Sequence, residues 1–184
     1  MASVTKIVGT GTNQTRSGSV QSWADPTNIT ADDANRSQTS DLQNLGHSDW
    51  LEGTMSGNVF AIAANQQIDG IEVDIEWKIN STGSGDSEID EVHLVSSLGD
   101  SNTKTGDGTG DASETYKTDT FGGATDTWGL SLTPAVVNAT SFGVRASWAE
   151  TDNGNGKRQE VDYISITVHH SDAPQSNKQH MVIE

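Results

Sequence analysis

A nine-residue segment, Ile71–Ile79, constrains the fold more than any other part of the chain. Its apolar members alternate strictly with charged ones: Ile71, Val73, Ile75, Trp77 and Ile79 against Glu72, Asp74, Glu76 and Lys78. Successive side chains of a β-strand point to opposite faces, so the pattern predicts a strand with one face on a core and the other in water. Such half-solvated strands are typical of antiparallel sheets.

The other apolar residues fall in short bursts separated by segments rich in Gly, Asn, Asp and Ser. These bursts predict further strands within 50–63, 89–98, 116–121, 128–132, 142–148 and 161–168. Val92 and Leu94 are expected to face inward. The last two strands are expected to form a hairpin across Asn153–Gly156, with Val161 and Tyr163 on the face opposite Ile164.

Helical signals are confined to two single turns, Thr30–Ala34 with Thr30 as N-cap and Thr133–Val137 with Pro134 at its first position. Many short strands joined by Gly-rich turns, without a long amphipathic helix, predict an all-β fold. The expected architecture is an antiparallel β-sandwich, jelly-roll-like, with flexible terminal arms.

Three parts of the chain follow from this pattern: an N-terminal arm or edge strand (1–20), a β-sandwich domain (21–170) and a C-terminal tail (171–184). Apolar clusters at Val4–Val8 and Met181–Ile183 are more than a solvated tail requires. They favour arms that dock on a neighbouring subunit. For Val4–Val8 the alternative is the first strand of its own sandwich.

The net charge of -16, from 26 acidic and 10 basic residues, argues against partners that are nucleic acids or anionic membranes. The chain contains no cysteine, which excludes disulfides and thiolate chemistry. No window approaches the length of an apolar membrane span, and residues 1–9 lack the apolar core of a signal peptide. We therefore expect a soluble protein that is made in a cytoplasm.

The sharpest catalytic candidate is the run from Glu72 to Glu76, which resembles the E-x-D-x-E strand of retaining β-glucanases with a jelly-roll fold. The resemblance implies Glu72 as nucleophile and Glu76 as acid/base. The alternative is the solvated face of an amphipathic strand in an acidic protein. Because the match covers five residues and only ten aromatic residues (five Trp, two Tyr, three Phe) are present to build sugar platforms, we predict no hydrolysis.

Two segments are candidates for metal binding. The 99–114 loop carries Asp100, Asp107, Asp111 and Glu114, whose oxygens suit calcium but whose spacing matches no known calcium motif. Calcium binding by this loop stays open. His169 and His170 are adjacent on a strand and therefore point to opposite faces. We predict no cofactor and no catalytic or metal residue.

The five tryptophans divide into two groups. Trp77 and Trp148 lie on inward faces and belong to the core. Trp23, Trp50 and Trp128 border loops, where they either anchor the fold or contact a ligand or a neighbouring subunit. Together with the terminal apolar residues they form the candidate partner interface, which comprises Val4, Ile7, Trp23, Trp50, Trp128, Met181 and Ile183.

An ordered set of short motifs runs through residues 20–170: Trp23–Pro26, Asn28–Asp32, Ile68–Val73, Phe121–Gly123, Asp126–Gly129, Ser141–Val144 and Val161–Val168. This order resembles a β-sandwich module common in structural proteins of tailed phages and in some bacterial surface proteins. The resemblance implies a non-enzymatic protein. It also implies that the charged residues after Gly70 belong to ordinary sheet architecture.

From this resemblance and the short chain we predict a capsid decoration, or cement, protein of a tailed bacteriophage. It would be made in the host cytoplasm and located on the capsid surface of the virion. Its partners would be the major capsid protein and further copies of itself in a homotrimer. The alternatives are a phage tail or receptor/glycan-binding module and, less favoured, a β-glucanase-like hydrolase.

Overall fold

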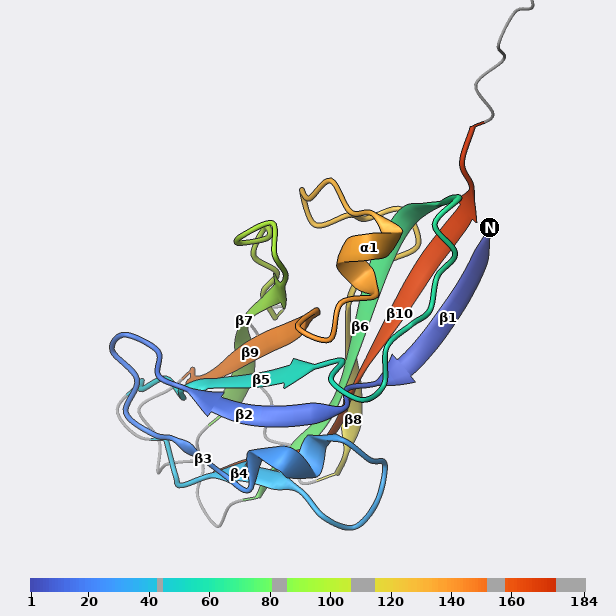
Figure 1. Ribbon diagram of the computed structural model, residues 1–184. Coiled ribbons are helices and arrows are strands. Elements are labelled where there is room, and N and C mark those ends of the chain that lie inside the picture. The colour runs from blue at the N-terminus through green and yellow to red at the C-terminus, as the bar shows by residue number, and fades with distance from the viewer. Residues whose placement is uncertain (43–44, 81–85, 107–114, 152–157, 175–184) are drawn as a thin grey trace, which may run out of the picture.

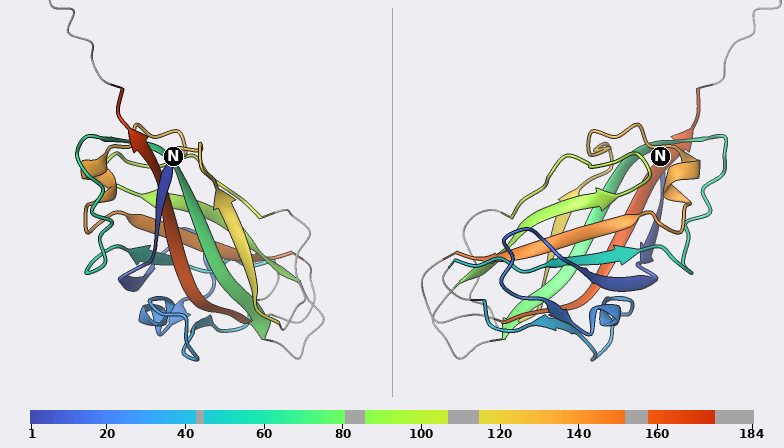
Figure 2. Two further views of the ribbon diagram at one scale, coloured as in Figure 1. Left: turned by 90° about the vertical axis from the view of Figure 1, so that its right-hand side faces the viewer. Right: turned by 60° about the vertical axis from the view of Figure 1, so that its left-hand side comes forward.

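The computed structural model describes residues 1–42, 45–80, 86–106, 115–151 and 158–174. Two antiparallel sheets pack face to face as a β-sandwich (Figures 1 and 2). The six-stranded sheet runs in the order β3 (Trp23–Ala24), β4 (Ser37–Thr39), β10 (Arg158–Asp172), β6 (Gln66–Asn80) and β8 (Lys117–Gly122), and β1 (Ala2–Ile7) also pairs with β10. The four-stranded sheet runs in the order β2 (Thr10–Gln14), β5 (Trp50–Thr54), β9 (Gly143–Glu150) and β7 (Ser87–Val95). The all-β sandwich expected from the sequence is confirmed.

From β5 onward, consecutive strands alternate between the two sheets, which is a jelly-roll-like path. The expected hairpin between the last two strands is therefore wrong: β9 pairs with β5 and β7, whereas β10 pairs with β6, β1 and β4. Among the described residues from β5 onward, no strand takes its backbone hydrogen bonds from the strand next to it in the sequence. The expected turn at 153–156 lies outside the described residues.

The core lies between the sheets and is built by the alternation of β6. Its inward residues, Ile71, Val73, Ile75, Trp77 and Ile79, are all fully buried, as predicted. Val92 and Leu94 face them from β7, also as predicted. The ring of Trp148 on β9 meets Trp77 edge-on at 5.9 Å between centroids, so both indoles belong to the core.

A β-bulge in β10 changes which of its residues face the core. Val161 pairs with Trp77 and Tyr163 pairs with Glu76, so Asp162 is an extra residue between two neighbouring pairs. Val161 consequently points into the core, where it is fully buried. The expectation that Val161 shares a face with Tyr163 is wrong, because the bulge interrupts the period of two.

Backbone turns shorten two of the expected strands. The strand within 50–63 ends at Thr54, and a turn follows in which the Asn58 amide donates to the Met55 carbonyl (2.9 Å). The expected strand at 128–132 is absent because Trp128 has a positive φ of 57° and begins a turn. The strand expected at 116–121 is confirmed as β8.

The two helical turns expected from the sequence have different outcomes. A short helix α1 (Pro134–Val137) begins after Thr133, whose side-chain oxygen accepts a hydrogen bond from the Val136 amide, as expected for an N-cap. The turn expected at 30–34 is wrong, because the 3-10 helix η1 (Pro26–Ile29) lies earlier and has Thr30 as its C-cap. Pro26 supplies the preset backbone angle at its first position. Neither helix is long and apolar enough to cross a membrane.

The first residues of the chain form an edge strand of their own sandwich. β1 runs antiparallel to β10, from Ala2 opposite His170 to Ile7 opposite Ser165 (Figure 1). Of the two possibilities left open for Val4–Val8, the structure has the intrinsic strand rather than a free arm. Residues 175–184, including the second apolar cluster, lie outside the described residues.

Several residues that carry the resemblance pack around the start of β6. The Ile71 amide donates to the Asp126 carbonyl, and the Ile71 carbonyl accepts from the Gly123 amide, each at 2.9 Å. The Trp128 Nε1 donates to the same carbonyl at 2.9 Å. A Cβ at Gly70 would lie 2.3 Å from the Gly123 carbonyl oxygen, so only glycine fits there. These motif residues are therefore architectural.

Candidate functional site

The outer face of the four-stranded sheet carries an ordered array of polar side chains. One row crosses all four strands in register: Thr12 on β2 lies opposite Glu52 on β5, Glu52 opposite Arg145 on β9, and Arg145 opposite His93 on β7. In the adjacent row Gln14 lies opposite Trp50. We call this surface the Trp50 face, comprising Thr12, Gln14, Arg16, Trp50, Glu52, Glu91, His93 and Arg145.

Trp50 is the aromatic centre of this face. Trp50 is half-buried, and its indole lies next to two guanidinium groups, with the Arg145 Cζ 4.9 Å and the Arg16 Cζ 5.1 Å from the ring centroid. The imidazole of His93 meets the indole edge-on at 5.4 Å between centroids. Guanidinium groups at this distance are attracted to the electron-rich ring face and hold the indole in place.

Arg16 reaches this position from the loop that follows β2, which crosses toward the far edge of the sheet (Figure 2, right). Its Nη2 contacts Asp90 at 2.7 Å and Glu91 at 2.8 Å, both on β7. A register shift between Ile89 and Glu91 makes Asp90 the extra residue of a bulge. At the near end of the loop, the Arg16 amide donates to the Asp49 carboxylate at 3.1 Å.

The charges of the face are paired but only partly solvated. Burial alone would raise the pKa of Glu91, but the hydrogen bond from His93 and the charge of Arg16 outweigh it and lower that pKa. For Glu52 burial dominates and raises the pKa, although the charge of Arg145 acts in the opposite direction. Arg145 also approaches the exposed Asp100 at 3.4 Å.

Some hydrogen-bonding capacity on this face is unused. The buried Nε of Arg145 and Nδ1 of His93 have no acceptor within the described residues. Thr12 and Gln14, at the β2 edge of the same two rows, are exposed. The arrangement therefore presents an aromatic ring surrounded by donors and acceptors at the spacing of the sheet, which suits a ligand with both apolar and hydroxyl surface.

The tryptophans expected at a partner interface separate in the structure. Trp23 (4% exposed) and Trp128 (0%) are buried in the core, and their Nε1 groups donate to the carbonyls of Asp49 and Ile71 at 2.9 Å. For these two the core interpretation is the right one. Trp50 alone of the three reaches the surface.

The remaining members of the predicted interface are less available. Val4 is partly buried against the core, and Ile7 is also partly buried at the inner end of β1. Met181 and Ile183 lie outside the described residues.

Sequence reasoning missed the charged members of the Trp50 face. Glu52 and Arg145 hold outward positions on short strands, so each reads as an ordinary solvated residue. Glu52 lies two residues after Trp50 and hence on the same side of β5, which is a usable signal. The approach of Arg16 carries no such signal, because it depends on how the loop after β2 crosses the sheet.

The carboxylates of the glucanase-like motif lie on the opposite side of the molecule. Glu72, Asp74 and Glu76 occupy the outer face of the six-stranded sheet, opposite Thr167, Ser165 and Tyr163 on β10. Asp74 accepts a hydrogen bond from the Thr120 hydroxyl at 2.6 Å. The motif is thus separated by the thickness of the sandwich from the aromatic centre of the Trp50 face.

A cleft of about 270 Å³ opens where β8 and β7 diverge between the two sheets. Trp77 borders it, but its Nε1 already donates to Asp119 at 2.7 Å and its ring lies beneath Lys117, 4.8 Å from the Nζ. Trp77 is also fully buried, so it offers a ligand in this cleft neither an exposed ring face nor a free polar atom.

The structure does not bring the metal-binding candidates of the sequence together as a site within the described residues. Within the 99–114 loop, residues 107–114 lie outside the described residues and Asp100 faces Arg145. The Nδ1 of His170 contacts Gln66 at 2.9 Å. A different set of carboxylates, from Asp32, Glu76 and Asp162, lies close enough to hold a cation.

No protein-family model matches the sequence, and no curated protein matches it. Among solved structures, a point mutant of the family 29 carbohydrate-binding module CBM29-2 has a TM-score of 0.36 and 10% identity over 91% of this chain and 93% of that chain. A second point mutant of CBM29-2, complexed with mannohexaose, has a TM-score of 0.35 and 11% identity over 92% and 94%. At TM-scores this low, the likeness carries no inference about what this chain binds.

Proposed function

We propose that this chain is a non-catalytic binding module that holds a neutral glycan chain against the Trp50 face. The observation that carries the proposal is the position of Trp50, half-buried between Arg16 and Arg145 and next to the row of polar residues that crosses all four strands. The proposal rests on this arrangement and not on the names of the similar structures.

The chemistry of a sugar ring matches that of the face. One side of a pyranose presents C–H groups that pack on an indole, and its edge presents hydroxyls that both donate and accept hydrogen bonds. Arg145 and Glu52 lie opposite each other across β5 and β9 and supply a planar donor beside a carboxylate acceptor. Neighbouring strands lie about 4.8 Å apart, so polar groups on successive strands recur at that interval along a glycan that lies across the sheet.

The charge of the molecule selects among glycans. A formal net charge of -16 repels sulfated or uronic-acid polymers as it repels phosphates. The cations of the face, Arg16 and Arg145, are already paired with Asp90, Glu91 and Asp100. A neutral polysaccharide is therefore the favoured class of ligand.

The test is binding to a panel of soluble neutral polysaccharides, including glucans, mannans, xylans and galactans. Affinity electrophoresis would identify the ligand, and titration calorimetry would measure its affinity. The Trp50→Ala variant is expected to lose binding while it retains its melting transition, because Trp50 is only half-buried.

The matched control is Tyr116→Ala. Tyr116 is also a half-buried aromatic residue beneath cations, with the Arg36 Cζ at 5.3 Å and the Lys78 Nζ at 5.0 Å from its ring, but it belongs to the side of the six-stranded sheet. This variant is expected to bind normally. A wild type that binds none of the polysaccharides, or equal losses in the two variants, would contradict the proposal.

Attachment to a tailed-phage capsid is the second candidate, and it is compatible with a glycan-binding face. The order of short motifs along the chain supports attachment to a capsid. The motifs around Ile71 build the fold, so the resemblance that they carry is a resemblance in architecture. The proposed partners are the major capsid protein and further copies of this chain in a homotrimer. Sedimentation of the protein with intact phage particles tests attachment to the capsid. The mass of the protein in solution tests the homotrimer. A protein that stays in the supernatant would count against a place on the capsid surface.

A further inference from the structure

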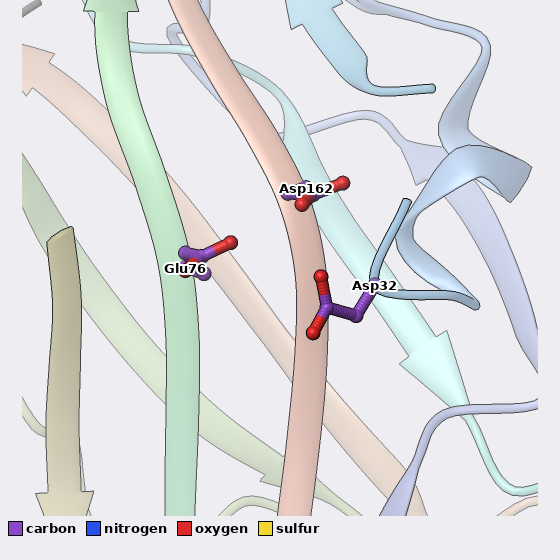
Figure 3. Close-up of side chains that lie close together, drawn as sticks. All are labelled: Asp32, Glu76 and Asp162. Carbon is purple, nitrogen blue, oxygen red and sulfur yellow. The ribbon is translucent and has the colours of Figure 1, made fainter. Parts of the chain in front are cut away.

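Three carboxylate groups from distant parts of the chain converge on the outer face of the six-stranded sheet (Figure 3). Glu76 comes from β6, Asp162 from β10 and Asp32 from the loop after η1. One oxygen atom from each lies within 4.8 Å of the others. We call this set the carboxylate triad.

Asp162 is the member that distinguishes the triad from an ordinary acidic surface. It is 6% exposed, and its Oδ1 is buried without a hydrogen-bond partner among the described residues. A buried carboxylate oxygen without a partner is costly. Figure 3 shows the carboxylate group of Asp162 beside those of Glu76 and Asp32. The carboxylate group that carries this unused oxygen is thus the one that the other two acids approach.

The basic residues of this region do not neutralise the triad. Arg36 and Lys78 pair with Glu160 instead, at 3.3 and 3.6 Å. Within the described part of the chain, no Lys or Arg forms an ion pair with any triad member. The cluster thus gathers three acidic groups around one position without a compensating cation from the protein.

The backbone holds the triad in place. The bulge in β10 puts Asp162 beside Glu76, and an antiparallel bridge between Thr30 and Tyr163 ties the start of the Asp32 loop to the same strand. Within the loop, the Asn35 amide donates to the Asp33 carboxylate at 2.7 Å. The loop therefore has its own local turn, close to the strand that carries Asp162.

We propose that the carboxylate triad binds a Ca²⁺ ion that clamps the Asp32 loop to β6 and β10. The donors are all oxygens, which is the ligand set that hard divalent cations select. Asp32 is exposed, so water has access to complete the larger and more flexible coordination shell of Ca²⁺. Mg²⁺ needs a tighter octahedral shell and is expected to bind more weakly.

The alternative occupant of this site is a proton shared between Glu76 and Asp162. Burial, the hydrogen bond with Asp162 and the charges of Asp162 and Asp32 raise the pKa of Glu76. Burial also raises the pKa of Asp162. Proton and cation therefore compete for one site, and the experiment must separate them.

The experiment compares thermal melts and calorimetric Ca²⁺ titrations of the whole chain at pH 7, after chelator treatment. Wild type is expected to gain Tm on addition of Ca²⁺ and to gain less with Mg²⁺. Asp162→Asn and Asp32→Asn are expected to lose the Ca²⁺-dependent gain. The second variant neutralises a charge on an exposed side chain and so tests the site even where the first fails to fold.

Asp74→Asn is the matched control, because it makes the same change in charge on the same face of β6 and keeps an oxygen for the Thr120 hydroxyl. It is expected to keep the full gain in Tm. A wild type insensitive to Ca²⁺ would overturn the proposal in favour of the shared proton. A gain that persists in Asp32→Asn and Asp162→Asn would equally overturn it, because the ion would then lie elsewhere. Neither result bears on glycan binding at the Trp50 face.

Discussion

Asp162 lies beside Glu76 because it is the extra residue of a β-bulge between the pairs Val161–Trp77 and Tyr163–Glu76. Without the bulge, alternation would send Asp162 to the core side of β10 whenever Tyr163 points outward. One inserted residue therefore keeps Val161 in the core and leaves an acidic side chain, almost fully buried, on the outer face. Burial is the largest cause that raises the pKa of each of the two carboxyl groups.

The first prediction concerns pH. Because the pKa values of Glu76 and Asp162 are raised in the folded state, folding favours their protonated forms. The stability that this contributes is present at low pH. It is lost as pH rises from the ordinary values of 4.5 and 3.8 through the raised ones.

In chelator, Asp162→Asn is therefore expected to gain stability relative to wild type as pH rises through this window. Melts of the two proteins from pH 3 to pH 8 would measure the difference. A constant difference across that range would contradict the raised pKa of the pair. Added Ca²⁺ is expected to reduce the difference in Tm between Asp162→Asn and wild type at neutral pH, because it stabilises wild type alone.

The second prediction concerns the two faces of β6. Ile75 is fully buried and Asp74 lies on the outer face. Ile75→Asp is expected to destabilise the domain by about 4 kcal/mol or to prevent folding, because it buries an unpaired charge. Asp74→Ala is expected to stay within about 1 kcal/mol, since it loses only the hydrogen bond from Thr120. Denaturant unfolding would measure the free energy of unfolding of both variants. Similar losses of stability in the two variants would refute the assignment of Ile75 and Asp74 to opposite faces.

The third prediction concerns the edge strand. Deletion of residues 1–7 removes the β1 ladder and exposes the edge of β10 from Ser165 to His170. The truncated protein is expected to melt at lower temperature and to self-associate, because an uncovered strand edge pairs with other chains. Melting and light scattering after size-exclusion chromatography would show both effects. A truncated protein with unchanged Tm and mass would mean that β1 contributes little to the sandwich.

The fourth prediction concerns hydrolysis. Wild type is expected to release no sugar from β-1,3 or mixed-linkage glucans, because Glu72 and Glu76 lie on the opposite face from Trp50 and Glu76 is directed at Asp162. Reducing-sugar assays of wild type and Glu72→Gln would check this. Turnover present in wild type and absent in the variant would restore the glucanase interpretation.

Local patterns in the sequence are sufficient to assign the class of fold and most of the core. Strict alternation assigns Ile75 to the core and Asp74 to solvent without any knowledge of the partners of β6, because the period of a strand is a local property. The same holds for Trp77, Val92 and Leu94, and for the helical turn that begins with Pro134, because proline fixes its own backbone angle.

Strand pairing, the bulge in β10 and both candidate sites depend on contacts between distant segments, which local patterns do not contain. The separation of β9 and β10 into different sheets depends on pairing with strands far away in sequence. The bulge at Asp162 is visible only against the register of β6. The Trp50 face and the carboxylate triad each join residues from at least three segments, so their chemistry arises only when the sheets and loops are assembled. Bringing distant segments together costs chain entropy, and burial of the whole core offsets that cost. A short motif contains no information about this balance.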